Sequence, residues 1–345
     1  MKDVVSLCIS TAAGKRATFL ARLVCLVALI GPMDIQATNA QESAAQFPSR
    51  DITIVVPFGA GGPPDSIARV VAAGLSQHLG KPVIVENRAG GSTALASRTV
   101  ARSQPDGYTL MAVDISFAVA PHVVSNLGTD PFKNFKPIGL SAKSEFTLLA
   151  SRQLGVSNLA EFLKLAKAKG NKLEVGHTGI GTTPYLAAVS FIRSTGINPL
   201  LVPYRTVGEA TNNVIGGHID AVFSAASTAI GIGSQAKVLG VTGPKRLAAL
   251  PDVPTFQESG VKVTGFENGS WYGLVAPVGT PDAIIAKLNS VLLATVADKA
   301  LAAKLMASGI ILSGSTPAEF GDLIKAQYDY WGTTLRQEGI EPEPK

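Results

Sequence analysis

The sequence has few of the residues on which most catalytic and metal sites depend. Its 345 residues include two cysteines and four histidines, and only 16% are charged. Both cysteines, Cys8 and Cys25, lie within the first 40 residues, so the rest of the chain has no thiol and suits an oxidising compartment. No paired-cysteine metal site, HExxH zinc motif or GxSxG nucleophile motif occurs, so we expect no metal and no catalytic residue.

Nucleotide-binding and nucleic-acid-binding signatures are also missing. The phosphate-binding pattern GxxxxGK[ST] does not occur, and the nearest approach to a dinucleotide pattern (179–184) has Pro184 at the third glycine position. Basic residues are dispersed, without the interleaved aromatic residues that bind single strands. We therefore expect no cofactor and no nucleic-acid partner.

Residues 1–40 have the layout of a secretory signal peptide. Lys15, Arg16 and Arg22 precede the apolar run LVCLVALIG (23–31), and small residues lead to Ala40, near which we expect cleavage. The run is shorter than the about 20 residues of a membrane span, and an uncleaved N-terminal anchor is the alternative. Cleavage removes four basic and two acidic residues, so the formal net charge of +5 falls by two. The remaining positive charge favours encounter with anionic small molecules.

After residue 50, β-branched runs alternate with amphipathic helical segments. DITIVVPF, KPVIVEN and YTLMAVD (108–114) are typical of strands, and apolar residues from Ile67 to Leu79 share one helical face. This alternation predicts an α/β fold of mostly parallel sheets flanked by helices.

The alternation restarts near residue 147, and the last block has no sheet of its own. We therefore expect two domains joined by a hinge, with the ligand cleft between them. Domain 1 would be discontinuous (46–146 plus 266–345), and domain 2 would be the insert (147–265). The alternative is one long doubly wound sheet.

Three glycine-rich stretches each end a strand-like run and precede a helix: PFGAGGPPD (57–65), NRAGGST (87–93) and TGIGTTP (178–184). In parallel α/β sheets, ligands bind at the carboxyl ends of the strands, where such loops lie. Glycine lets backbone N–H groups approach a ligand, and a helix N-terminus favours an anion. The motifs favour a carboxylate over a phosphate. For any single loop, an ordinary turn without a ligand is the alternative.

Two other features have a structural and a functional interpretation. Asp65 and Arg69 are four residues apart on the first helix, and we interpret them as a helix N-cap and a local ion pair rather than as catalytic groups. His177 precedes the third loop and could touch a ligand.

The quoted motifs resemble one known family. PFGAGGPPDSIAR, NRAGGS, DGYTL (106–110), GIGT, VPYR (202–205), IGGHIDAVF, LPDVPTFQESG and WYGLVAPVGTP (271–281) stand in the order and spacing of the Bug proteins. These are the TctC-like extracytoplasmic solute receptors of tripartite tricarboxylate transporters. The resemblance covers essentially the whole chain after the signal peptide.

The resemblance implies a two-domain Venus-flytrap receptor in the periplasm that closes over a small organic carboxylate. It implies ligand contacts from two loops of domain 1, from Ser116, and from three segments of domain 2. The predicted residues are Phe58, Gly59, Ala60, Gly61, Gly62, Arg88, Ala89, Gly90, Gly91, Ser92, Ser116, Gly181, Thr182, Thr183, Tyr204, Arg205 and Ser224.

Two departures from the family pattern bear on the ligand. Arg205 stands where lysine is frequent, and arginine can hold a distal carboxylate by two parallel hydrogen bonds. Tyr185 stands near a frequent histidine and could favour a ring-bearing ligand. The alternative is that both side chains point to solvent or pack between helices.

The sequence therefore predicts a non-enzymatic, monomeric periplasmic binding protein that delivers a di-, tri- or aromatic carboxylate to a tripartite tricarboxylate-type membrane transporter. One alternative is a receptor that presents its ligand to a membrane sensor kinase. Another is a secreted enzyme that uses Ser116 or Ser224 with His177.

Overall fold

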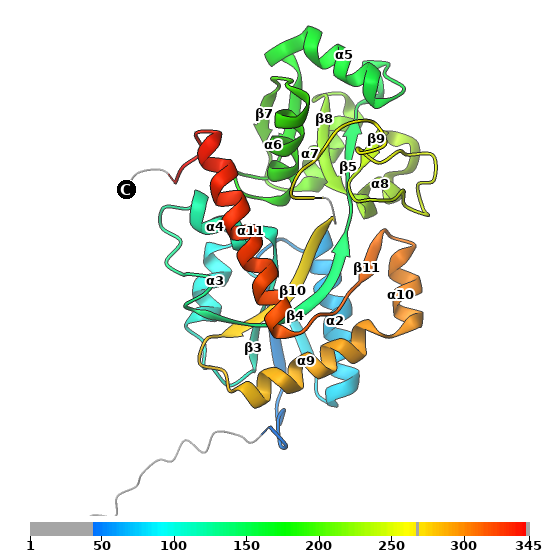
Figure 1. The fold of residues 1–345 in the computed structure, drawn as a ribbon. Coiled ribbons are helices and arrows are strands. Elements are labelled where there is room, and N and C mark those ends of the chain that lie inside the picture. The colour runs from blue at the N-terminus through cyan, green and yellow to red at the C-terminus, as the bar shows by residue number, and fades with distance from the viewer. Residues whose placement is uncertain (1–43, 267–268, 343–345) are drawn as a thin grey trace, which may run out of the picture. The chain divides into compact units, whose positions relative to one another are not determined.

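The fold was obtained as a computed structural model, which describes residues 44–266 and 269–342. The predicted signal peptide lies outside these residues. Two separate sheets, rather than one long sheet, organise the described chain. They are joined where β4 (Phe135–Ser144) runs into β5 (Phe146–Ala150), with only Glu145 between the two strands (Figure 1).

Sheet A has six strands in the order β11-β4-β10-β3-β1-β2. Besides β4, its strands are β1 (Ile52–Val56), β2 (Val83–Asn87), β3 (Thr109–Asp114), β10 (Ser270–Pro277) and β11 (Ile310–Leu312). β1 pairs in parallel with β2 and β3, whereas β10 is antiparallel to β3 and β4, and β11 is antiparallel to β4. The sheet is therefore mixed, not mostly parallel, because β10 re-enters sheet A from the opposite direction after the chain has built sheet B.

Sheet B has five strands in the order β7-β6-β8-β5-β9. Besides β5, its strands are β6 (Glu174–His177), β7 (Leu200–Pro203), β8 (Ala221–Ala225) and β9 (Lys237–Val241). β6 is parallel to β7 and β8, and β5 is antiparallel to β8 and β9. The strands that end in the three glycine-rich stretches, β1, β2 and β6, all belong to parallel pairs.

Helices cover both faces of each sheet, as the alternating pattern predicts. One face of sheet A packs against α2 (Pro63–Leu79), α9 (Asp282–Val296) and α10 (Lys299–Met306), and the other against α3 (Ala94–Ala101), α4 (Ile115–Val123) and α11 (Pro317–Gln337). Sheet B packs against α5 (Leu159–Lys169) and α6 (Thr183–Thr195) on one face and against α7 (Val207–Gly216) and α8 (Ala226–Ile232) on the other.

One hydrophobic cluster extends from sheet B to the helix that covers sheet A. The ring of Phe146 on β5 lies 6.1 Å from that of Phe266, which lies 5.8 Å from the indole of Trp331 on α11. Such aromatic contacts fix the geometry of the connection between the sheets. Among the described residues, no helix combines the length and apolar character needed to cross a bilayer.

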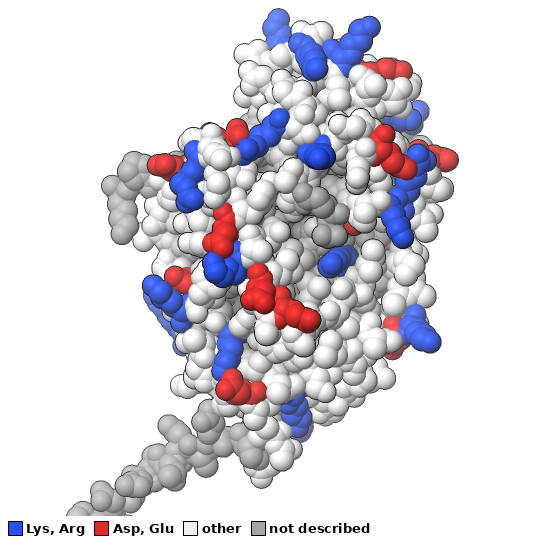
Figure 2. Space-filling view, in the orientation of Figure 1, with Lys and Arg blue, Asp and Glu red and all other residues white. Residues whose placement is uncertain are grey.

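Charged side chains are distributed without a dominant sign on the face shown in Figure 2. Basic and acidic residues are interspersed there.

Candidate ligand-binding site

The three glycine-rich loops follow β1, β2 and β6, so each lies at the carboxyl end of a parallel strand. We call them loop 1 (57–62), loop 2 (88–93) and loop 3 (178–182). β1 and β2 are neighbours, and the side-chain amide of Asn87 donates to the carbonyl of Phe58 at 3.0 Å. Loops 1 and 2 therefore form one continuous edge of sheet A.

Loops 1 and 2 present most of their predicted ligand residues to solvent. The backbone of Gly59, Ala60, Gly61, Ala89, Gly90 and Gly91 is exposed, whereas Phe58, Gly62, Arg88 and Ser92 are partly buried. In loop 2, four consecutive residues have a positive φ: Gly90 (148°), Gly91 (57°), Ser92 (46°) and Thr93 (81°). For the two non-glycine residues this conformation is strained, and such strain is concentrated at ligand sites.

Asp65 has a different local role from the predicted N-cap. α2 begins at Pro63 with Gly62 as its N-cap, so Asp65 lies within the first turn. Its buried carboxylate accepts hydrogen bonds from the backbone N–H of Gly61 (2.9 Å), from the amide of Asn87 (2.8 Å) and from Arg69 (3.0 Å). The predicted ion pair with Arg69 is confirmed. The N–H of Gly61 is therefore bonded to Asp65 and is not free for a ligand.

The hydrogen bonds around Asp65 also decide its ionisation. Burial alone would raise the pKa of the carboxyl group, but hydrogen bonds from Arg69, Gly61 and Asn87, together with the charge of Arg69, hold the pKa below its ordinary value. Asp65 thus stays ionised and ties loop 1 to both α2 and β2.

Loop 3 is held by its own side chains. The hydroxyl of Thr182 donates to the carbonyl of Gly179 at 2.7 Å, and the backbone N–H of Gly179 donates to Nδ1 of His177 at 3.0 Å. Gly179 and Gly181 have φ values of 110° and 81°, which favour glycine. Unlike loops 1 and 2, the end of this loop is buried at Gly181, Thr182 and Thr183.

Contacts between elements of the two sheets bring several predicted residues together. The hydroxyl of Ser92 in loop 2 donates to the carbonyl of Ile180 in loop 3 at 3.4 Å. The hydroxyl of Thr183, the first residue of α6, donates to the carboxylate of Asp114 at 3.1 Å. Loop 2, loop 3 and the start of α4 therefore meet at one place.

Asp114 is a residue of this place that the sequence interpretation missed. It ends β3 and caps α4, because its carboxylate accepts the backbone N–H of Ser116 at 2.9 Å. Only 4% of Asp114 is exposed. Burial raises the pKa of its carboxyl group to about 6, and hydrogen bonds from the Ser116 N–H and the Thr183 hydroxyl oppose this rise. The sequence feature that could have indicated Asp114 is its place as the one acidic residue at the end of the apolar run YTLMAVD (108–114).

Facing Asp114 on the next strand is Tyr272, its register partner on β10. Burial, and then the negative charge of Asp114, raise the pKa of the Tyr272 phenol. This phenol therefore stays protonated and neutral at neutral pH.

Several buried hydroxyl groups near the ends of these strands have no well-formed hydrogen bond among the described residues. They include those of Ser224 on β8 and of Thr93 at the end of loop 2, and that of Ser116, which still lies close enough to the Asp114 carboxylate to lower its pKa. A buried hydroxyl without a partner costs free energy, and a ligand that accepts its hydrogen bond would recover that cost. Ser116 and Ser224 were predicted ligand residues, whereas Thr93 was not.

The geometry for the predicted hydrolase alternative is absent from the described part of the chain. The Nδ1 atom of His177 accepts the Gly179 N–H, and the imidazole packs 5.0 Å from the ring of Tyr185. Burial lowers the pKa of His177. No hydrogen bond there joins His177 to Ser116 or Ser224, and the described residues contain no cluster that could hold a metal ion. A nucleophile needs its base within hydrogen-bond reach.

The side chain of Tyr185 packs in the core and Arg205 is exposed, which corresponds to the alternative stated for these two residues. Tyr185 is buried in the hydrophobic core, 6% exposed, beside His177. Arg205 is exposed at the end of β7, the edge strand, and its backbone N–H donates to the carboxylate of Glu209. Its neighbour Tyr204 is partly buried and donates its N–H to the carbonyl of His177. The buried ring of Tyr185 therefore belongs to the hydrophobic core and lies against the imidazole of His177.

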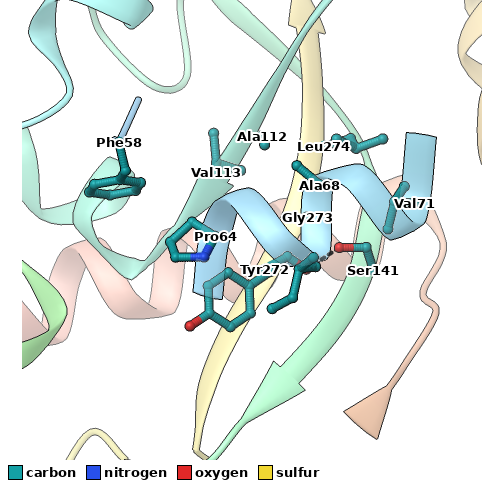
Figure 3. Close-up of a pocket in the computed structure, with 11 residues that line it drawn as sticks. Phe58, Pro64, Ala68, Val71, Ala112, Val113, Ser141, Tyr272, Gly273 and Leu274 are labelled. Atoms are coloured by element: carbon teal, nitrogen blue, oxygen red, sulfur yellow. Dashed lines mark hydrogen bonds between the residues drawn. The ribbon is translucent and has the colours of Figure 1, made fainter. Parts of the chain in front are cut away.

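An apolar pocket lies beneath loop 1 (Figure 3). Phe58 and Pro64 line it on the loop side, and Ala68, Ala112 and Tyr272 are among its other walls. None of the lining side chains is charged. The pocket therefore offers no charged donor to a carboxylate, and the exposed residues of loops 1 and 2 are the better candidates.

We expect Gly181→Ala to destabilise the protein more than Gly80→Ala. Both glycines have a positive φ (81° and 67°), so each alanine carries a left-handed strain of about 1 kcal/mol. A Cβ on Gly181 would lie 2.6 Å from Cγ2 of Val123 on α4, whereas a Cβ on Gly80 meets no atom within 4 Å. This overlap should cost a further ~1–3 kcal/mol and displace loop 3 from α4. Urea unfolding measures both variants, and equal losses would contradict the packing of loop 3 on α4.

Comparison with known proteins gives a consistent result. The sequence profile of the family described as "Tripartite tricarboxylate transporter family receptor" matches residues 67–340. The structure of the periplasmic binding protein BugD is similar, with a TM-score of 0.79 and 32% identity over 86% of this chain and 100% of BugD.

Two similar structures contain dicarboxylates. Rpa4515 of R. palustris with adipate has a TM-score of 0.80 and 29% identity over 86% of this chain and 99% of that protein. MatC (Rpa3494) from Rhodopseudomonas palustris with bound malate has a TM-score of 0.76 and 30% identity over 84% of this chain and 100% of MatC.

Proposed function

Because the chain belongs to the family of tripartite tricarboxylate transporter receptors, we propose that it captures a small dicarboxylate and delivers it to a membrane transporter of that type. Membership agrees with the resemblance of its sequence motifs. The family is one of solute-binding receptors rather than of enzymes.

The observation that carries the proposal is the meeting of loops 2 and 3 beside the exposed backbone of loop 1. Loops 1 and 2 contribute exposed glycine and alanine residues, and buried hydroxyls without a well-formed hydrogen bond lie in loop 2 (Thr93), at the start of α4 (Ser116) and on β8 (Ser224). Charge-assisted hydrogen bonds contribute about 1.5–3 kcal/mol each, so three or four of them suffice for micromolar affinity. The dicarboxylates in the two similar structures support a ligand with two carboxylates.

In the proposed complex, one carboxylate lies on loops 1 and 2 and is then enclosed by residues from sheet B. Of the predicted residues, Ser116 and Ser224 would donate hydroxyl hydrogen bonds, and Gly59, Ala60, Gly90 and Gly91 backbone hydrogen bonds. Ser92 and Thr183 would line the site, because their hydroxyls already donate to the carbonyl of Ile180 and to the carboxylate of Asp114. Gly61 would shape loop 1 without contributing its N–H, which Asp65 already accepts. Arg205 would reach the ligand only through its long, exposed side chain, as a contact to the second carboxylate.

We further propose that the chain is exported to the periplasm after cleavage near Ala40 and acts there as a monomer. The two domains (46–146 plus 266–345, and 147–265) would close by a hinge at Glu145 and at the segment that returns to β10. Presentation of the ligand to a sensor kinase is the second candidate, and it would use the same closed form.

We expect dicarboxylates to stabilise the protein against thermal unfolding. A ligand at 100 times its Kd adds about 2.7 kcal/mol of stability. The panel contains adipate, malate, a tricarboxylate, an aromatic carboxylate, a sugar and a cation. Stabilisation by sugars or cations, with none by any carboxylate, would refute the proposal.

The matched glycine variants locate the site in the same assay. Gly181→Ala should bind the stabilising acid at least about tenfold more weakly, because loss of one good contact to a charged group costs about 1.4 kcal/mol or more. The variant Gly80→Ala should bind the same acid with the affinity of the parent, because Gly80 caps the C-terminal end of α2, far from loop 1 at its start. Equal affinity of both variants would place the ligand away from loop 3.

A further inference from the structure

We propose that this chain takes up one proton on Asp114 when it binds a carboxylate ligand, an inference that rests on the proposed function. The relevant observation is a buried acidic group at the point where the candidate ligand loops meet. It is unusual for a site that should receive an anion, because like charges repel strongly where water is excluded.

The position of Asp114 follows from three contacts. It ends β3, the strand next to β1 in sheet A, so its carboxylate lies at the same edge as loops 1 and 2. One carboxylate oxygen accepts the N–H of Ser116, and the other accepts the hydroxyl of Thr183, which follows loop 3 directly. Both donors are themselves next to, or among, the proposed ligand contacts.

No described cation neutralises Asp114. The titratable and charged groups on the elements packed around it include Tyr272 on β10; Arg98 on α3; Asp65 and Arg69 on α2; Glu86 and Arg88 at the end of β2; His177, Tyr185 and Arg193 on β6 and α6; Lys143 and Glu145 at the end of β4; and His122, Tyr328, Asp329 and Arg336 where α4 packs on α11.

Five cations on these elements are engaged elsewhere. Arg69 is paired with Asp65, Arg88 with Glu86 and Arg193 with Glu338. Arg98 donates to the carbonyl of Leu127, and the charge of Lys143 acts on Glu145. Tyr272 is neutral, because burial and then the negative charge of Asp114 raise the pKa of its phenol. Among the described residues, Asp114 makes no ion pair. An anionic ligand therefore meets an uncompensated carboxylate.

Protonation resolves this conflict. Burial already brings the pKa of Asp114 to about 6 in the absence of a ligand, so the proton needs little additional driving force. A ligand carboxylate nearby raises that pKa further, and by linkage the protonated form binds the ligand more tightly. The neutral carboxyl group can still accept hydrogen bonds from Ser116 and Thr183, and its own O–H becomes a donor.

The test is isothermal titration calorimetry of the exported protein with adipate and with malate, at pH 7.0, in phosphate and in Tris. The two buffers have different ionisation enthalpies, so the difference in measured enthalpy gives the number of protons taken up. We expect about one proton per ligand, and an affinity that falls about tenfold per pH unit between pH 7 and pH 8.5. Asp114→Asn should take up no proton and show a flat affinity profile over this range.

Two further variants separate Asp114 from other buried groups. Glu145→Gln, which removes the other buried carboxylate near the sheet junction, should keep the uptake of the parent. Thr183→Val removes a hydrogen bond to the ionised form of Asp114, so the fall in affinity should begin at a higher pH. If Asp114→Asn does not fold, the shifted pH profile of Thr183→Val tests the role of Asp114 instead.

The outcomes distinguish the two proposals. Binding without proton uptake, uptake that persists in Asp114→Asn, or uptake that is lost in Glu145→Gln overturns the coupling but leaves the receptor function standing. If neither acid nor any other carboxylate of the panel binds, the proposed function fails, and the coupling fails with it.

Discussion

Asp114→Asn raises the free energy of unfolding by about 3 kcal/mol at pH 7.5, and this gain disappears as the pH approaches 4. The expected size follows from the pKa, which rises from 3.8 to about 6 in the folded chain, at 1.36 kcal/mol per unit. Asparagine keeps an oxygen for the Ser116 N–H, and its amide can donate to the Thr183 hydroxyl, so both contacts have a substitute.

The sign of the effect follows from proton binding. Because the pKa of Asp114 is raised, the folded chain keeps a proton that the unfolded chain releases between about pH 4 and pH 6. The stability of the parent therefore falls as the pH rises through this window and stays lower above it. Asparagine has no such proton, so the variant lacks this fall.

Urea unfolding at four pH values between 4.5 and 7.5 measures this difference. Asp298→Asn is the matched control, because Asp298 also caps a helix, α10, through backbone N–H groups but is exposed. We expect that control to stay within about 0.5 kcal/mol of the parent at each pH. A variant Asp114→Asn with reduced stability and the pH dependence of the parent would contradict the assigned ionisation.

Asp65→Ala lowers the free energy of unfolding by about 3 kcal/mol at neutral pH. The substitution leaves the N–H of Gly61 and the amide of Asn87 without their acceptor, and each such loss costs about 1–3 kcal/mol in a buried setting. It also removes the partner of Arg69, whose side chain is half exposed and can be hydrated, so that part of the loss is small.

The matched control for Asp65 is Asp329→Ala on α11. Asp329 forms an i, i+4 ion pair with Lys325 at 2.7 Å, but both side chains are exposed. Its loss should cost at most about 0.5 kcal/mol. Because the pKa of Asp65 is lowered, its contribution is present at neutral pH and is lost as the pH falls below 4. Equal effects of the two substitutions in urea unfolding would show that Asp65 does not organise loop 1.

The sequence predicted the elements that have a clean local pattern. The strand SWYGLVAP matches β10 at both ends, and the strands that precede the three loops were recognised by their β-branched residues. Helix α11 also has a clean local pattern at its start, where Pro317 follows Thr316 and a capping box is formed by Thr316 and Glu319.

Two elements were missed because their local pattern is set by tertiary packing. β4 contains Pro137, Gly139 and two lysines, which weaken the signal of a strand. Gly139 is needed there because a Cβ would lie 2.7 Å from the amide of Asn289 and 3.0 Å from a backbone carbonyl. α4 is almost uniformly apolar and contains Pro121, so it has no helical periodicity to recognise.

The candidate site was predictable only in part, because some of its contacts depend on tertiary packing and not on local sequence. Glycines at strand ends indicate loops that approach a ligand, and this property is local. The hydrogen bond between Asp114 and Thr183 joins residues 69 positions apart, on different sheets, and no spacing in the sequence indicates it. The bond of Gly61 to Asp65 spans four residues, but it depends on where α2 begins.

The strand order of sheet A also has a consequence for the time course of synthesis. β10 lies between β3 and β4, yet it begins at residue 270, after all of sheet B has been made. At about 5–20 residues per second, roughly 8–30 s separate the completion of β3 from the appearance of its neighbour β10. During that interval sheet A has an open gap at its centre, and the chain stays short of its final fold. This delay suits the proposed export, because a chain whose central sheet is still open can pass unfolded through a translocation channel.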